Sequence, residues 1–223
     1  MNVLVACEES QAVCTAFREK GHEAFSCDVQ HCAIYNHMEW HVVERAEILI
    51  RGHCHFQTVD GVFHSVEQWD LIIAHPPCTY LSAAGAVRLY DSSHRIKDRA
   101  RYEKGMEARR FFMLFLQADC PRVCVENPIP MKIFGLPPYT QIIEPFFFGE
   151  PWRKKTALWL RGLPALHATN PTTPTGLWVG ASGSKRQTYK GKKDGIYLNT
   201  KRDPKIRART FQGVAQAMAE QWG

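Results

Sequence analysis

The sequence contains no apolar run that approaches the length of a membrane span, and no internal repeat is visible. Its opening residues 1–6 are too short for a secretory signal peptide and lack a positively charged flank. The eight cysteines are irregularly spaced in a chain of 223 residues, which is long enough to fold without disulfide cross-links. We therefore expect a cytoplasmic α/β protein with one sizeable core and no membrane partner.

The positive charge is concentrated in one segment of the chain. Residues 183–209 contain ten lysines and arginines against two aspartates, a local balance of +8, so the remainder carries −2 of the overall +6. A basic segment beside a near-neutral body is typical of a lobe that binds phosphate groups. Trp178, Tyr189 and Tyr197 are available within or beside this segment to stack on bases. A solvated loop without a partner is the alternative.

The apolar run 71–74 is followed directly by His75 and two prolines. Such a run predicts a strand that is buried on both faces, as in the centre of a parallel sheet. Because the prolines end ladder pairing, Cys78 should lie just beyond the carboxyl end of a central strand, where open α/β sheets bind ligands. Cys78 is therefore a candidate nucleophile, and a small buried loop cysteine is the alternative.

The amino-terminal segment has the outline of a Rossmann-type nucleotide-binding half. Residues 2–6 predict a buried strand, 11–20 a helix that Ser10 could cap, and 24–27 a second strand that ends at Asp28. An acid at this strand end can accept hydrogen bonds from ribose hydroxyls. The turn between the first strand and the helix contains no glycine and does not match the dinucleotide-binding fingerprint.

A second group of polar residues follows another predicted strand. Residues 122–125 predict a buried strand, Glu126 and Asn127 follow it, and Pro128 is expected to stop it. Since the carboxyl ends of parallel strands meet at one edge of a sheet, we expect Glu126 to lie beside Cys78.

The stretch 29–69 contains six of the ten histidines and two cysteines. Cys32, His37 and His41, or the run 53–55, could supply zinc ligands, but their spacing matches no familiar closed zinc site. We predict no metal site here, and a zinc site is the alternative.

Three motifs occur in order along the chain: Pro-Pro-Cys at 76–78, Glu-Asn at 126–127, and Gly-Val at 213–214, at the start of a terminal helix. In this combination the chain resembles the DNA cytosine methyltransferases that act at carbon 5. More closely, it is similar to small methyltransferase-like proteins of phages and prophages, through the stretches AHPPCTYL, VENP, KTALWLRGLP and RTFQGVAQAMAEQWG. This likeness covers most of the chain except roughly 30–68 and 168–200.

The resemblance implies an α/β fold, namely a Rossmann-like class I methyltransferase sheet with helices on both faces and a small basic lobe. It divides the chain into a catalytic domain at 1–165, a reduced target-recognition region at 166–205, which is the basic lobe, and a C-terminal helix at 206–223 that returns to the catalytic domain. The implied activity is S-adenosylmethionine-dependent methylation of carbon 5 of cytosine in DNA. Its specificity would be relaxed or partner-dependent, because only about forty residues replace a large recognition region.

The resemblance also assigns catalytic roles. Cys78 would add as a thiolate to carbon 6 of cytosine, which makes carbon 5 nucleophilic. Glu126 would hydrogen-bond cytosine N3 and the amino group. The other catalytic candidates are Asn127, which would orient the loop, Lys154 or Lys155, which would lie near cytosine O2, and Arg88, which would stabilise the thiolate.

The implied cofactor is S-adenosylmethionine, whose ribose Asp28 would hold. The chain departs from the family at His75, which replaces a small residue, and in the cofactor turn, which has two acids and no glycine. The other cofactor-binding candidates are Ala6, Cys7, Glu8, Glu9 and Ser10 in that turn, which would hold the methionine end, together with Pro76 and Gly213.

Two other functions are compatible with the same residues. A pyrimidine-nucleotide one-carbon transferase could use the Cys78 and Glu126 pair on a free nucleotide, and the small recognition region favours this reading. A catalytically inactive nucleic-acid-binding relative is favoured by the altered cofactor turn.

Overall fold

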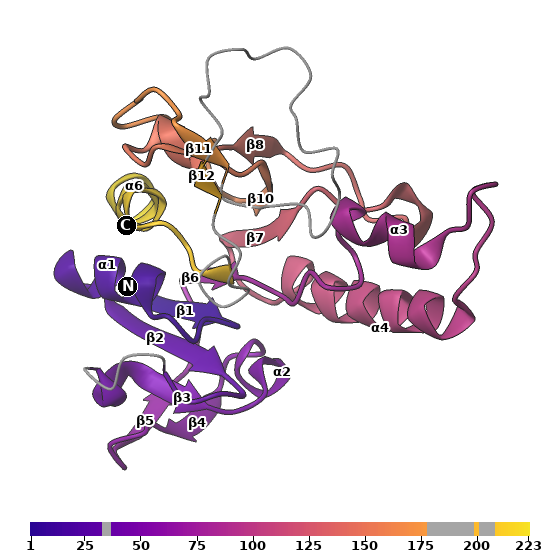
Figure 1. The fold of residues 1–223 in the computed structure, drawn as a ribbon. Helices are drawn as coiled ribbons and strands as arrows, with labels where there is room; N and C mark the ends of the chain where they lie inside the picture. Colours follow the sequence, from indigo (N-terminus) through magenta and orange to yellow (C-terminus); the bar gives the residue numbers. More distant parts are fainter. Residues whose placement is uncertain (33–36, 178–198, 201–207) are drawn as a thin grey trace.

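The computed structural model describes residues 1–223 except 33–36, 178–198 and 201–207 (Figure 1). Most of the predicted basic lobe, including its three aromatic residues, lies outside the described residues. None of the helices in the described part of the chain is long and apolar enough to cross a membrane.

A seven-stranded sheet forms the centre of the molecule, in the order β3-β2-β1-β6-β7-β10-β8. The strands from β3 to β7 in this order run parallel, and β10 is antiparallel to both of its neighbours. The arrangement is Rossmann-like, and β10, the strand of this sheet that comes last in the chain, is inserted between β7 and the edge strand β8. The strand bounds are β1 (Asn2–Ala6), β2 (Glu23–Asp28), β3 (His41–Val43), β6 (Leu71–Ala74), β7 (Val123–Pro128), β8 (Gln141–Ile143) and β10 (Thr156–Arg161).

Helices cover both faces of this sheet (Figure 1). On one face, α1 (Ala12–Glu19) and α6 (Gln212–Trp222) share a core with the sheet, and α4 (Arg99–Leu116) packs on the other face. The side chains of β1 alternate between the two cores, since Val3 and Val5 face α1 and α6. The predicted Rossmann-like α/β fold, with helices on both faces, is therefore confirmed.

Shorter elements connect these parts. The strands β4 and β5 form an antiparallel hairpin, and β9, β11 and β12 form a small parallel sheet. The bounds are η1 (Met38–Trp40), α2 (Ala46–Leu49), β4 (Cys54–Gln57), β5 (Phe63–Val66), η2 (Ala83–Gly85), α3 (Ala86–Leu89), η3 (Lys132–Phe134), η4 (Pro145–Phe147), β9 (Trp152–Arg153), β11 (Gly176–Leu177) and β12 (Asn199–Thr200).

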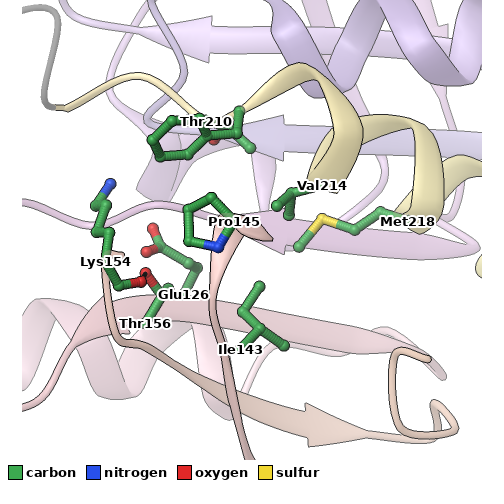
Figure 2. Close-up of a pocket in the computed structure, with 9 residues that line it drawn as sticks. Glu126, Ile143, Pro145, Lys154, Thr156, Thr210, Val214 and Met218 are labelled. Atoms are coloured by element: carbon green, nitrogen blue, oxygen red, sulfur yellow. Dashed lines mark hydrogen bonds between the residues drawn. The ribbon is translucent and has the colours of Figure 1, made fainter. Parts of the chain in front are cut away.

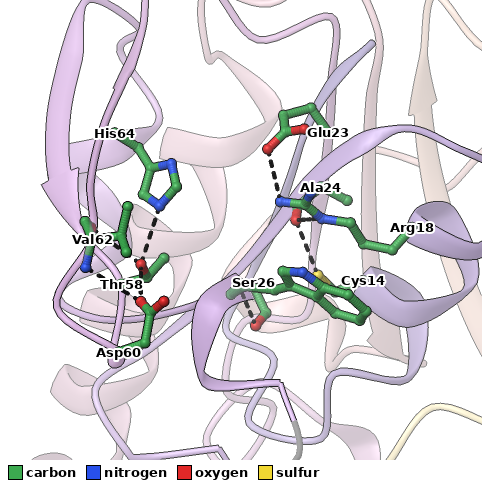
Figure 3. Close-up of polar contacts among 10 residues, drawn as sticks. Cys14, Arg18, Glu23, Ala24, Ser26, Thr58, Asp60, Val62 and His64 are labelled. Atoms are coloured by element: carbon green, nitrogen blue, oxygen red, sulfur yellow. Dashed lines mark hydrogen bonds and ion pairs between the residues drawn. The ribbon is translucent and has the colours of Figure 1, made fainter.

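Several residues of the histidine-rich stretch 29–69 make local hydrogen bonds. Nε2 of His64 lies 3.1 Å from Oγ1 of Thr58 (Figure 3), and Nδ1 of His41 lies 2.8 Å from Oγ of Ser26. Within the described ranges, no group of three or more His, Cys, Asp or Glu side chains could hold a metal ion. These two histidines therefore have structural partners.

Candidate active site

The strands β6 and β7 lie side by side but end at different levels. Their ladder stops at Ala74 and Val125, whereas β10 continues to pair with β7 as far as Pro128. The expectation that the strand ends before Glu126 is therefore wrong. Pairing with β10 keeps these residues extended, and the proline comes where β7 has become an edge on the β6 side, a position that tolerates proline.

A buried hydrogen bond from Asn127 ties the loop after β6 to β7. Nδ2 of Asn127 donates to the carbonyl oxygen of Pro76 over 3.0 Å, and Asn127 is fully buried. This bond fixes the backbone two residues before Cys78. Asn127 therefore holds the backbone of the loop at Pro76.

Cys78 is half-buried at the start of the next turn. Its carbonyl oxygen accepts hydrogen bonds from the amides of Leu81 and Ser82. A side chain of α4 holds the following residue, since Nη2 of Arg101 donates to the carbonyl oxygen of Thr79 over 2.7 Å. The thiol is thus carried by a backbone that is fixed from both sides.

A pocket of about 330 Å³, counted with its mouth open to solvent, lies at the carboxyl end of β7. Figure 2 shows the side chains of Glu126 and Lys154 directed toward the same space, with Val214 and Met218 of α6 on its far side. Cys78 is not among the lining residues. These are Glu126, Ile143, Pro145, Lys154, Thr156, Thr210, Phe211, Val214 and Met218.

Glu126 is held as a carboxylate in this pocket. Burial by itself would raise its pKa, but the hydrogen bond from His75 and the positive charge of Lys154 outweigh burial, and the pKa lies below its usual value. Nδ1 of His75 lies 3.1 Å from Oε2 of Glu126, and the two side chains are only 10% and 18% exposed. Glu126 is therefore an anion of the pocket that interacts with Lys154, which also lines the pocket, and with His75.

The thiols in the sheet and the adjoining turn have a different environment from that of Cys78. Burial raises the pKa of Cys7 and of Cys124 well above the usual value, and it raises the pKa of Cys27 to about 12. A buried thiol with a raised pKa is a poor nucleophile. These three thiols are therefore poor candidates for the nucleophile.

In the predicted cofactor turn, Glu8 caps helix α1, in place of Ser10. Its carboxylate accepts hydrogen bonds from the amides of Val13, over 2.7 Å, and Cys14, over 3.1 Å. The N-cap residue itself is Gln11, whose side chain makes no capping bond, so the expected Ser10 cap is wrong. A carboxylate that reaches forward from the turn satisfies the free amides as a cap would.

The backbone of this turn follows a course that glycine usually provides. Cys7 and Gln11 have φ values of 60° and 56°, both in the left-handed region. Ala6 is fully buried, and Glu9 and Ser10 are half-buried. The absence of glycine from the sequence therefore does not prevent a glycine-like turn.

The remaining cofactor candidates have different surroundings. Asp28 is half-buried at the end of β2, and its Oδ1 accepts the amide of Gln30 over 2.9 Å. Pro76 is buried. A Cβ on Gly213 would lie 1.9 Å from the carbonyl oxygen of Phe148, so close helix packing alone accounts for this glycine.

The structure separates the catalytic candidates that the sequence grouped together. Lys154 lines the pocket, whereas Lys155 is exposed, and Arg88 is exposed on α3. The sequence alone assigned no role to His75, which was noted only as a departure from the family, or to Arg101. The histidine that replaces a small residue before the prolines was the feature of the sequence that could have identified His75 as a site residue.

No family model and no curated protein matches the chain. One solved structure that resembles it, with a TM-score of 0.45 and 14% identity, is of a candidate DNA modification methyltransferase encoded within a prophage of E. coli. The alignment covers 78% of this chain, which spans about half (53%) of that protein.

Proposed function

We propose that the protein transfers a methyl group from S-adenosylmethionine to carbon 5 of cytosine in DNA, through a covalent adduct with Cys78. The observation that carries this proposal is the placement of Glu126 and Lys154 in one pocket, at the sheet edge where the Cys78 loop is anchored by Asn127. An acid and a cation that line one pocket, with a thiol on the adjoining loop, suit chemistry on a pyrimidine.

The chemistry explains why these residue types are needed. Carbon 5 of cytosine is a poor nucleophile until a thiolate adds at carbon 6. In this mechanism Cys78 supplies the thiolate, and Glu126 binds the N3 and amino edge of the ring, where charge develops. Lys154 lies near O2. S-adenosylmethionine, when bound, supplies the methyl group.

The amino-terminal turn suits a cofactor without phosphates. In dinucleotide-binding sheets the pyrophosphate lies at the N-terminus of the first helix, but here the Glu8 carboxylate occupies that place. A dinucleotide would bring a second anion to these amides. S-adenosylmethionine has no phosphate, and its ribose would be held by Asp28 and its methionine end by the turn from Ala6 to Ser10.

DNA as the substrate draws support from cations near the Cys78 loop. The ring of Tyr80 lies under the guanidinium of Arg101, at 5.0 Å, and near the ammonium of Lys104, at 5.7 Å. Such groups can contact phosphates without reading sequence. The target cytosine would have to be flipped out or single-stranded to reach the pocket.

The test is intact-mass analysis after incubation with S-adenosylmethionine and an oligodeoxynucleotide that contains 5-fluorocytosine. The fluorine at carbon 5 cannot leave as a proton does, so the adduct persists. We expect one protein–DNA adduct with wild type and with Cys54→Ser, a control in the β4–β5 hairpin, and none with Cys78→Ser.

Other results would favour the alternative functions. An adduct with 5-fluorodeoxycytidine monophosphate but none with the oligonucleotide would indicate a nucleotide-level transferase. DNA binding without an adduct, together with no heat of binding for S-adenosylmethionine, would indicate an inactive relative.

A further inference from the structure

His75 stands between two acidic residues at the carboxyl edge of the sheet. Its Nδ1 lies 3.1 Å from Oε2 of Glu126, a residue 51 positions later in the chain. On the other side, the charge of His75 lowers the pKa of Glu8, although burial is the larger effect and leaves that pKa raised. The ring therefore links the turn before α1 to the pocket at the end of β7.

The hydrogen-bond pattern fixes what each group can do. Both carboxylate oxygens of Glu8 accept amides of α1, so Glu8 is committed to the helix. Among the described residues, Nε2 of His75 is buried and has no hydrogen-bond partner. Nδ1 faces the Glu126 carboxylate, which leaves the second oxygen of Glu126 for the pocket.

The proposed reaction has a proton requirement that Glu126 does not meet alone. When the Cys78 sulfur bonds to carbon 6, the C5=C6 double bond shifts to C4=C5 and an electron pair moves onto N3. N3 then needs a proton. Because Glu126 is held as a carboxylate, it has no proton to donate, so another group must supply the proton to it.

We propose that His75 supplies this proton: Nδ1 gives it to Oε2 of Glu126, and the carboxyl group then turns so that the same O–H gives it to cytosine N3. The inference rests on the proposed function. As the sulfur adds, the imidazolium becomes neutral imidazole and N3 becomes protonated. After methylation, carbon 5 loses its proton to water, the sulfur leaves, and N3 returns its proton by the same route. No other reactant is needed.

The charged and titratable groups around the pair are few. Glu8 comes from the β1–α1 turn, Lys154 from the segment between β9 and β10, and the buried thiol of Cys124 from β7 itself. In the described part of the chain, Nδ1 of His75 contacts Glu126 at 3.1 Å, and an imidazole can give up a proton and take it back.

The first test reads the tautomer of His75 from its ring ¹⁵N shifts in the wild-type protein. We expect the neutral ring to keep its proton on Nδ1, and this preference to disappear in Glu126→Ala. His53, whose Nδ1 lies 2.7 Å from Glu67 with both side chains exposed, is the matched control, and we expect water to weaken its preference. A neutral ring with its proton on Nε2 would overturn the proposal without any variant.

The second test is the pH profile of adduct formation with 5-fluorocytosine DNA and S-adenosylmethionine. The rate of adduct formation by wild type should follow a bell-shaped pH profile. It should rise with pH as the Cys78 thiolate forms and fall at higher pH as His75 loses its proton. In His75→Asn the amide nitrogen can still donate to Glu126 but cannot titrate. We expect about a 100-fold slower reaction whose profile lacks the falling limb.

The outcomes separate the two proposals. A bell of unchanged shape in His75→Asn, whatever its height, would show a merely structural histidine and overturn the proton role. An adduct absent from wild type at every pH would overturn the methyltransferase proposal, and the proton role with it. The tautomer measurement reports the His75–Glu126 pair in either case.

Discussion

Asn127 on β7 and Pro76 on the β6 loop are joined by a single buried hydrogen bond of 3.0 Å. The bond connects two segments that the chain brings together from 51 residues apart. It ties the strand that carries Glu126 to the loop that carries Cys78.

Asn127→Ala should destabilise the fold, because the Pro76 carbonyl loses its donor. A lost buried hydrogen bond costs about 1–3 kcal/mol, which urea denaturation can measure. Asn127→Asp should cost more, since it places a carboxylate against a carbonyl. Unchanged denaturation midpoints in both variants would show that this link contributes nothing.

Lys154 and Lys155 offer a matched pair for the pocket. Lys154→Met should slow adduct formation with 5-fluorocytosine DNA by roughly 100-fold, because it removes a charge that acts on Glu126. Lys155→Met, at an exposed neighbouring position, should retain most of the rate. Equal losses in the two variants would point instead to general attraction of DNA.

The titration of Glu126 makes the free energy of unfolding depend on pH in the acidic range. Its folded pKa lies below the ordinary value despite burial, because the His75 bond and the Lys154 charge favour the carboxylate. That stabilisation is present above an unfolded pKa of about 4.3 and is lost as pH falls through the lower folded pKa.

Glu126→Gln removes this titration. The difference in unfolding free energy between wild type and the variant should therefore shrink as pH falls from about 7 to about 3, as measured by urea denaturation. Glu8, with a raised pKa, acts in the opposite direction but is present in both proteins. A difference that stays constant with pH would contradict the assignment.

Gly213→Ala should loosen the terminal helix. The new methyl would lie 1.9 Å from the carbonyl oxygen of Phe148, so α6 or η4 must move. Overpacking of this kind costs about 1–3 kcal/mol. Thermal unfolding checks it, with Gln216→Ala on the exposed side of α6 as control. A variant as stable as the control would mean that the helix relaxes freely.

Arg101→Ala should free the segment after Cys78. It deletes the bond to the Thr79 carbonyl and one of two cations over Tyr80. Amide hydrogen exchange in residues 79–82 should become faster. Lys104→Ala removes only the other cation and should leave exchange nearly unchanged. Identical exchange in both variants would exclude a role for the guanidinium bond.

Local patterns predicted the parts of the site that depend on neighbours in sequence. The apolar run before the prolines identified β6, and the polar residues after the next run located Glu126. Ser10 failed as a cap because the carboxylate of Glu8, earlier in the turn, reaches the amides first. A cap search limited to the residue next to the helix does not find such a side chain.

The rest of the site depends on long-range contacts. His75 and Glu126 meet only because β6 and β7 are adjacent in the sheet and end at different levels. The sequence alone could not tell which of Lys154 and Lys155 lines the pocket, because this depends on the course of the chain into the antiparallel strand β10. Arg101 lies on a helix whose charges, read from spacing alone, look like an ordinary solvated face.

The unequal ends of β6 and β7 have a mechanical consequence. Among the described strands, the backbone of β7 beyond Val125 pairs with β10 alone, and on the β6 side the described hydrogen bonds are made by the side chains of Glu126 and Asn127. A shift of β10, or of β8 next to it, would therefore move residues 126–128 of β7 and the Glu126 side chain with them. Changes on the outer, antiparallel side of the sheet should therefore disturb Glu126 more than changes of similar size around β2 and β3.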